Sequence, residues 1–150
     1  MTSVAFHTGV PDPVDYACRL LRKAYRQGAR LVVTAPVATL DRLDQALWLF
    51  EQEEFVPHLR LRRKEDVTER NRRTPVWLSE SATVAVDATV WVNLGADPEV
   101  VIDGFERVIE VVGDDGANVE AGRRRWRRYV ASGLTPVNHP FGRTAPEART

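Results

Sequence analysis

The stretch Val4–Phe50, VAFHTGVPDPVDYACRLLRKAYRQGARLVVTAPVATLDRLDQALWLF, decides the fold class through its hydrophobic pattern. Apolar residues cluster at 4–8 and in RLVVT at 30–34, as in buried strands. Between these clusters, residues 13–27 repeat apolar side chains at spacings of three and four. This segment follows a capping aspartate and stops at a glycine, which predicts a helix. A second helix is expected at 38–50. Because strand and helix alternate, the sequence predicts a parallel sheet covered by helices.

The rest of the chain continues this alternation. Three further apolar runs predict strands: 75–79 (PVWLS), 89–94 (TVWVNL) and 107–112 (RVIEVV). A short helix is expected at 98–105, and a final helix that follows Asp114 and Asp115 and runs to about Ser132. The predicted fold class is therefore α/β, a three-layer α/β/α sandwich with a mostly parallel sheet.

Length and composition fit one folded unit. The chain has 150 residues, is 43% hydrophobic and contains one cysteine, Cys18, which we expect to pack in the core. After Pro136 the sequence contains Pro, Gly and Arg instead of an apolar pattern. We expect one domain over residues 1–142 and a flexible tail at 143–150. A lone cysteine forms no internal disulfide, and no apolar run approaches the roughly 18 residues that cross a bilayer. These features predict a cytoplasmic protein without a membrane segment.

Charge is balanced overall but segregated along the chain. Lys plus Arg and Asp plus Glu both total 21, so net charge gives no long-range attraction for nucleic acid. Residues 60–73 hold seven bases against three acids, residues 87–120 hold nine acids against one base, and Arg dominates again at 123–128. We interpret 60–74 as a mobile, solvated loop. The segregation predicts a partner that is recognised through local electric fields.

The first strand–helix turn, Thr8–Pro13 (TGVPDP), argues against a nucleotide site. It has one glycine, no lysine and two prolines, which lack the backbone N–H groups that bind phosphate. The three histidines, His7, His58 and His139, show no metal-ligand spacing, and no nucleophile-elbow motif is present. We therefore expect no catalytic site, metal or cofactor, and a degenerate nucleotide-binding enzyme is the weakest hypothesis.

The most informative stretch is RRRWRRYV at 123–130, in the final predicted helix. At about 100° per residue, Trp126 falls on the apolar stripe that packs on the sheet. Arg123 and Arg127 follow one edge of this stripe, and Arg125 lies on the other edge. An apolar seam beside two guanidinium groups is typical of a pocket for a short ligand with an apolar anchor and negative charge. A solvated arginine face and a nucleic-acid surface are the alternatives.

Three segments, in order, give the chain a family resemblance. They are LDQALW at 43–48, FVPH at 55–58, and Arg123-x-x-Trp126-Arg127 followed by Gly133 at the spacing of the family pattern. With the strands between them, they resemble the chi subunit of bacterial DNA polymerase III, a small accessory protein of the clamp-loader assembly. The resemblance extends from residue 4 to about 141.

The resemblance implies a nucleotide-binding-like fold that lacks the phosphate loop, and a non-catalytic role within the DNA polymerase holoenzyme. It also implies two partners: the psi subunit, and the acidic C-terminal tail of single-stranded DNA-binding protein, which ends in Pro-Phe. By position, Phe55 and Trp126 would line the apolar pocket for the terminal Phe ring. Arg123 and Arg127 would bind the terminal carboxylate and the preceding aspartates. Contact with DNA would then be mainly indirect.

Two positions depart from the family pattern. Trp126 stands where a tyrosine is common, and Val119 stands where some relatives have a lysine. No motif identifies the psi-binding surface, for which the strands around Trp77 and Trp91 are candidates. The competing hypothesis is a module that binds single-stranded DNA directly, through the Arg-rich C-terminal helix and loop 60–73.

Overall fold

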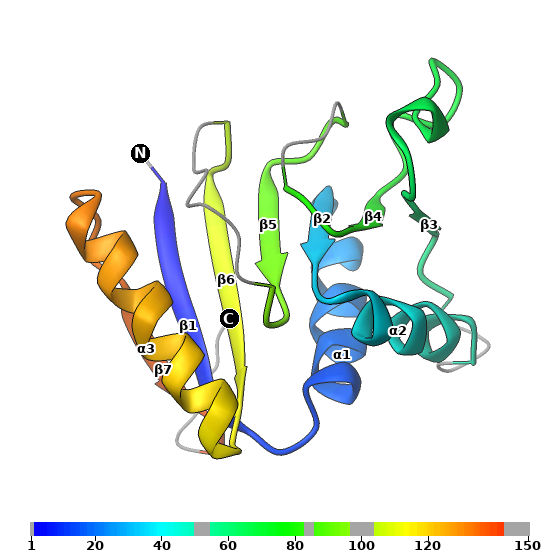
Figure 1. Ribbon diagram of the computed structural model, residues 1–150. Helices are drawn as coiled ribbons and strands as arrows, with labels where there is room; N and C mark the ends of the chain where they lie inside the picture. Colours follow the sequence, from blue (N-terminus) through cyan, green and yellow to red (C-terminus); the bar gives the residue numbers. More distant parts are fainter. Residues whose placement is uncertain (1, 50–54, 83–85, 97–103, 143–150) are drawn as a thin grey trace.

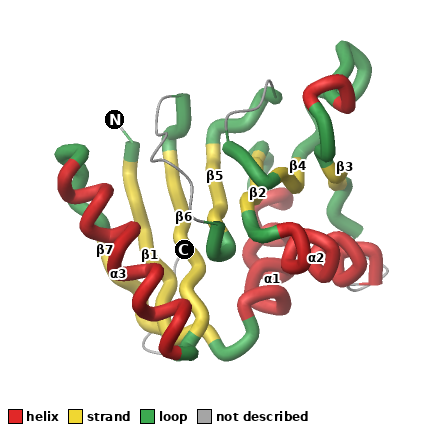
Figure 2. Tube along the Cα trace, in the orientation of Figure 1, coloured by secondary structure: helices red, strands yellow, loops and turns green. Residues whose placement is uncertain are grey.

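The computed structural model describes residues 2–49, 55–82, 86–96 and 104–142. Within these residues, seven strands form one parallel sheet in the order β3-β4-β2-β5-β6-β1-β7, and three α-helices pack against it (Figure 1, Figure 2). The strands are β1 (Ser3–Val10), β2 (Leu31–Thr34), β3 (His58–Arg60), β4 (Val76–Ser79), β5 (Val90–Asn93), β6 (Arg107–Gly113) and β7 (Val137–Pro140). The helices are α1 (Pro13–Arg26), α2 (Val37–Leu49) and α3 (Gly116–Ala131), with a 3-10 turn, η2, at Lys64–Asp66.

Alternating side chains give the sheet two apolar faces. On one face, Leu31 and Val33 of β2 pack in a core with α1 and α2. On the other face, Val32 of the same strand belongs to a second core that includes Tyr129 of α3. Because successive strand residues point to opposite faces, both faces of the sheet are covered and the apolar runs are continuous. The predicted three-layer α/β/α sandwich is confirmed.

Capping residues set the ends of α1 and α3. The Asp12 carboxylate accepts a hydrogen bond from the backbone N–H of Asp15 at 3.1 Å, and Asp115 accepts one from Asn118 at 2.9 Å. Each satisfies a backbone donor that has no partner within the helix. After α3, Gly133 has a φ of +89°, the left-handed conformation that ends many helices. The helix limits expected from the sequence are thus confirmed.

The two edge strands, β3 and β7, are not predicted by the sequence. All four residues of β7 are exposed, although the strand pairs with β1 and the backbone N–H of Phe141 donates to Thr8 O at 2.8 Å. An edge strand that buries so little has no apolar pattern to detect. The sequence analysis gives no element after Pro136, and the structure adds β7 there, within the domain expected over residues 1–142.

The segment between β3 and β4 is a loop, as predicted, but it also contributes to the core. Leu61 is buried and Val67 is partly buried in the core that contains Trp77. The Asp66 carboxylate accepts backbone N–H bonds from Arg62 and Arg63 at 2.8 and 2.9 Å. The segment is therefore a largely exposed loop that packs two of its side chains, Leu61 and Val67, against the core.

Two expectations fall outside the described residues. The helix predicted at 98–105 lies almost entirely on residues 97–103, and the tail lies on 143–150. None of the described helices is long and apolar enough to cross a membrane.

Candidate partner-binding surfaces

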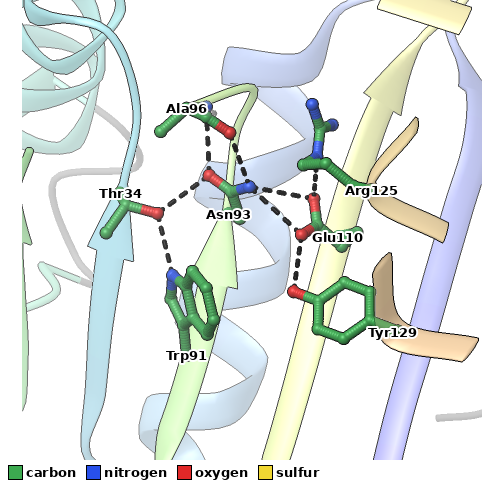
Figure 3. Close-up of polar contacts among 7 residues, drawn as sticks. All are labelled: Thr34, Trp91, Asn93, Ala96, Glu110, Arg125 and Tyr129. Atoms are coloured by element: carbon green, nitrogen blue, oxygen red, sulfur yellow. Dashed lines mark hydrogen bonds and ion pairs between the residues drawn. The ribbon is translucent and has the colours of Figure 1, made fainter. Parts of the chain in front are cut away.

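A buried ion pair connects α3 to the centre of the sheet. Glu110 of β6 faces α3 and is fully buried. Its carboxylate accepts hydrogen bonds from Arg125 Nε and from the Tyr129 hydroxyl, both at 2.8 Å (Figure 3). Asn93 Nδ2 donates to the same carboxylate at 3.0 and 3.1 Å. Three donors therefore converge on one buried anion, the arrangement that makes a buried charge tolerable.

The environment of Glu110 shifts two pKa values. Burial raises the pKa of Glu110, while Arg125, Asn93 and Tyr129 act in the opposite direction because they stabilise the carboxylate. Burial also raises the pKa of Tyr129, with the neighbouring Glu110 charge adding to the effect. The phenol therefore remains a hydrogen-bond donor to the carboxylate.

The same network continues across the ends of two further strands. Asn93 Oδ1 accepts from the Thr34 hydroxyl at 2.8 Å and from the backbone N–H of Ala96 at 3.0 Å. The Trp91 indole donates to the Thr34 hydroxyl at 2.8 Å. Polar contacts thus join β2, β5, β6 and α3 in one connected set (Figure 3).

This network fixes the rotation of α3. Arg125 is only 2% exposed, so it lies inside the molecule and not on the second edge of the apolar stripe, where the helical projection placed it. The helical projection places residues around the helix axis but does not show what each side faces. In the fold, the side of α3 that carries Arg125 faces Glu110 on β6, and the two side chains pair in the interior. With Arg125 inside, the exposed side of α3 carries Arg123, Arg124 and Arg127.

The predicted site residues on α3 lie on one helix surface. Trp126 is partly buried, with its ring centroid 5.0 Å from that of the buried Phe6 in β1. Arg123 and Arg127 are exposed, one helical turn apart, and neither forms an ion pair within the part of the chain that the structure describes. The surface thus combines an indole fixed by packing with guanidinium groups that have no acidic partner among the described residues.

Phe55 lies elsewhere, in a second aromatic group. Its ring centroid is 5.1 Å from that of Trp48 in α2 and 5.8 Å from that of His58 in β3. Both ring nitrogens of His58 face oxygen acceptors, the Asp44 carboxylate at 2.9 Å and the Val56 carbonyl at 2.8 Å. These bonds hold the segment after α2 against the helix. We call the exposed part of this group, Trp48 and Phe55, the aromatic patch; the two side chains are 61% and 40% exposed.

The structure separates Phe55 from Trp126. Phe55 lies beside α2 and the edge strand β3, whereas Trp126 packs on β1, on the other face of the sheet. β3 and β1 are five positions apart in the strand order, a span of about 24 Å at 4.8 Å per strand. The expectation that both residues line one pocket is therefore wrong. Without the resemblance, the sequence pattern favours a core position for Phe55, and only the resemblance assigns this residue to the tail pocket.

The structure also tests the expectations for Trp77, Trp91 and Cys18. All residues of β4 and β5, including Trp77 and Trp91, are buried, so these strands expose no side chains for a psi-binding surface. Cys18 is buried as predicted, and burial raises its pKa to about 11, which keeps the thiol protonated.

The carboxyl end of β1 is already occupied by the protein's own contacts. The Asp12 carboxylate takes the N–H of Asp15 at the start of α1, where a phosphate would otherwise bind. At the end of the neighbouring β6, the Asn118 amide would lie 3.1 Å from a Cβ placed on Gly113. At these strand ends, the protein's own side chains Asp12 and Asn118 lie next to the backbone.

Comparison with known proteins identifies the family. The family described as DNA polymerase III chi subunit, HolC, matches residues 1–137. The chain belongs to the DNA polymerase III chi subunit family. It is similar to the DNA polymerase III subunit chi of Pseudomonas aeruginosa, with 31% identity over 149 residues that cover 95% of this chain and 99% of the relative. Membership in the chi family places the chain in the DNA polymerase III assembly and in DNA replication.

The fold has wider relatives than the chi family. A solved structure of the C-terminal domain of S. cerevisiae Dbp5, bound to Gle1 and IP6, matches with a TM-score of 0.59 and 12% identity. The match covers 93% of this chain and 90% of the yeast chain. At this identity the likeness concerns the fold alone.

Sequence reasoning missed two features of this chi-family chain. One is the pair Glu110 and Arg125, for which the only signal was an acidic residue inside the apolar run RVIEVV. The other is the exposed pair of Trp48 and Phe55, whose first member lies in the family segment LDQALW. An exposed tryptophan beside an exposed phenylalanine becomes visible only when the burial of each side chain is known.

Proposed function

We propose that this chi-family chain is a non-catalytic adaptor whose α3 surface binds the acidic C-terminal tail of single-stranded DNA-binding protein. One observation carries the proposal: Arg123 and Arg127 are exposed, unpaired among the described residues, and adjacent to the partly buried Trp126. A ligand that ends in Pro-Phe and carries aspartates matches both parts of this surface.

The chemistry of binding follows from these three side chains. Guanidinium groups form two-pronged hydrogen bonds with carboxylates and are always charged, so they suit a terminal carboxylate and aspartates. The indole of Trp126 supplies an apolar face for the Phe ring, and its packing against Phe6 fixes its position before the ligand arrives. Pre-formed contacts reduce the ordering cost of binding.

The expected affinity is modest. Burial of one Phe contributes about 1.5–3 kcal/mol, and each hydrogen bond to a charged group contributes a similar amount. After ordering costs, the sum corresponds to a dissociation constant on the order of micromolar. Several tails presented along coated DNA raise the effective concentration, so a weak single contact supports a stable association that still exchanges.

We assign the aromatic patch to the psi subunit. Trp48 and Phe55 are large, exposed apolar side chains, and Leu49 beside them is 78% exposed. Exposed aromatic residues that lie together are enriched at protein interfaces, where they bury large areas. Because the patch and the α3 surface lie on opposite faces of the sheet, one chain can hold both partners at once. This arrangement would connect coated DNA to the holoenzyme.

The decisive experiment is calorimetry with a tail peptide. We expect Arg123→Ala to weaken binding by about 1.5–3 kcal/mol, with little change in fold stability because the side chain is exposed. The matched control is Arg124→Ala, which removes an exposed arginine from the same helix at a different angle. Equal affinity for the Arg123→Ala variant and the wild type would remove α3 from the site.

A second measurement separates a pocket from a diffuse charge effect. Deletion of the terminal Phe of the peptide should weaken binding more than neutralisation of one aspartate. The opposite order would show that the contact depends on charge alone.

A further inference from the structure

The amino-terminal ends of three adjacent strands bring four arginines to one place. In the parallel register, Leu31 of β2 is aligned with Val76 of β4 on one side and Val90 of β5 on the other. The residues just before these strands therefore lie at one edge of the sheet. Arg30 precedes β2, the exposed arginines 70, 72 and 73 precede β4, and Asp87 precedes β5. We call this set the arginine edge.

Three of the guanidinium groups share a single carboxylate. Arg30 Nη1 lies 3.8 Å from Asp87 Oδ2, Arg72 Nη2 lies 3.4 Å from Asp87 Oδ1, and Arg73 Nε lies 3.8 Å from Asp87 Oδ2. Arg72 has a second acidic partner, Glu69, at 3.3 Å. Four arginines thus face two acids, since Arg70 adds a charge and forms no ion pair within the described residues. The edge keeps an excess of positive charge.

The backbone holds these side chains in place. The N–H of Asp87 donates to Arg72 O at 3.3 Å, and the N–H groups of Thr89 and Val90 donate to Arg30 O at 3.0 and 3.2 Å. The N–H of Leu31 donates to Pro75 O at 2.7 Å. Like charges are therefore kept close together by the ends of the sheet, a placement that favours an anion as the missing partner.

The surroundings of the arginine edge distinguish its ligand from that of α3. The tryptophans of the neighbouring strands, Trp77 and Trp91, are buried, so no aromatic side chain of these strands offers a stacking surface or an apolar anchor here. Beside Arg123 and Arg127, in contrast, Trp126 supplies such an anchor. Guanidinium groups without an exposed tryptophan on the neighbouring strands suit a ligand that presents repeated negative charge and no required side chain.

We propose that the arginine edge binds the phosphodiester backbone of single-stranded DNA, without sequence preference. Phosphate oxygens accept the two-pronged hydrogen bonds that guanidinium groups offer, and backbone contacts carry no sequence information. DNA is the polyanion that a chain of the DNA polymerase III assembly meets. The inference does not depend on the tail-binding function, because it uses none of the residues of α3 or the aromatic patch.

The arrangement predicts weak binding that depends strongly on salt. Each phosphate contact with single-stranded DNA contributes about −0.7 to the slope of log affinity against log salt, so three or four contacts give a slope of about −2 to −3. In about 50 mM salt, loss of one contact should weaken binding roughly five- to tenfold. Binding at this edge adds to the tail contact when both ligands belong to the same coated strand.

The test is fluorescence anisotropy of a labelled oligothymidine with the full chain at low salt, without single-stranded DNA-binding protein. We expect the double variant Arg30→Gln/Arg73→Gln to lose most of the affinity for the oligonucleotide. The dependence of log affinity on log salt should also become less steep, because two exposed guanidinium groups that can bind phosphate are removed. The matched control is Arg123→Gln/Arg127→Gln, which should bind the oligonucleotide as the wild type does.

A third variant should change the affinity for oligothymidine in the opposite direction. Asp87→Asn removes the acid that three arginines share, and the backbone bond of residue 87 to Arg72 is retained. We expect this variant to bind oligothymidine several-fold more tightly than the wild type. General damage to the fold would not produce a gain, so this result separates a binding surface from a structural ion-pair cluster.

Three results would overturn the proposal. One is a wild-type chain that does not bind the oligonucleotide at low salt. Another is equal affinity for the wild type, the Arg30/Arg73 double variant and Asp87→Asn. The last is a variant of the arginine edge that loses binding of the tail peptide but still binds the oligonucleotide. That result would assign the edge to an acidic protein partner. The first two outcomes do not bear on Arg123→Ala in the calorimetry above, so the two proposals can succeed or fail separately.

Discussion

Replacement of Arg125 by methionine tests whether the buried ion pair holds α3 on the sheet. Methionine keeps much of the side-chain volume and a high helix propensity, so the change removes mainly the charge. The fully buried Glu110 then keeps only Asn93 and Tyr129 as donors. A buried carboxylate that has lost its cation is left without charge compensation.

The expected loss of stability is large. Removal of one partner from a buried ion pair costs about 3–5 kcal/mol. In a chain of this length, each kcal/mol lowers Tm by about 2–4 °C, so we expect Tm to fall by about 6–20 °C. The assay is urea unfolding followed by fluorescence of the four tryptophans, with thermal unfolding as a second probe.

The pH dependence gives this prediction a distinct signature. Burial already raises the pKa of Glu110 above its ordinary value of 4.5, and loss of Arg125 removes a group that opposes this shift. A carboxyl group whose pKa is higher in the folded state binds more protons than in the unfolded state. Its stabilising contribution is therefore present below the ordinary value and is lost as pH rises. The deficit of Arg125→Met should grow as pH increases above 4.5.

The control is Arg124→Met, the same change at the neighbouring exposed position. Surface substitutions of this kind change stability by about 0.5 kcal/mol or less. If Arg125→Met and Arg124→Met unfold at the same urea concentration, the guanidinium does not lie in the buried network and the rotation of α3 has another cause.

Three further predictions follow from other parts of the structure. Burial, with His139 and Arg107 nearby, lowers the pKa of His7 from 6.5 to about 4, so the folded state disfavours protonation of this imidazole. The free energy of unfolding should therefore fall by up to about 3 kcal/mol as pH drops from 6.5 to 4. The variant His7→Phe should lack that part of the pH dependence in urea unfolding, and an unchanged profile would contradict the assignment. A Cβ at Gly122 would lie 3.0 Å from Val112 Cγ1, so Gly122→Ala should push α3 away from β6 and lower the stability by about 1–3 kcal/mol, measured by thermal unfolding. If this variant is as stable as the wild type, α3 can shift on the sheet without cost. Phe55→Ala should abolish or weaken psi binding in calorimetry and leave tail-peptide affinity unchanged; a loss of peptide affinity would place Phe55 in the tail pocket after all.

The α3 surface shows how one arginine run serves two purposes. Five arginines in RRRWRRYV look alike in the sequence, yet Arg125 ends inside the protein and its neighbours end outside. The buried member fixes the helix rotation, and this rotation decides which cations face solvent. The contact between Arg125 and Glu110 thus sets which arginines of this run are exposed.

Much of the fold follows from the sequence because buried parallel strands and capped helices leave local patterns. The apolar runs at 30–34 and 75–79 correspond to β2 and β4, and the capping aspartates mark where α1 and α3 begin. The edge strands leave no such pattern, since β7 exposes all four of its residues. Local patterns report burial, and an edge strand is hardly buried.

The candidate sites divide in the same way. The sequence by itself determined that Trp126 lies on the apolar stripe of a helix with Arg123 and Arg127 along its edge, because these residues are neighbours on one helical turn. Only the tertiary structure decided that Phe55 joins Trp48 and lies far from Trp126, and that three arginines meet at Asp87. These contacts join residues that are distant in the chain, and they depend on which face each helix covers and which strands are adjacent. A sequence pattern of period two or 3.6 carries no information on either choice.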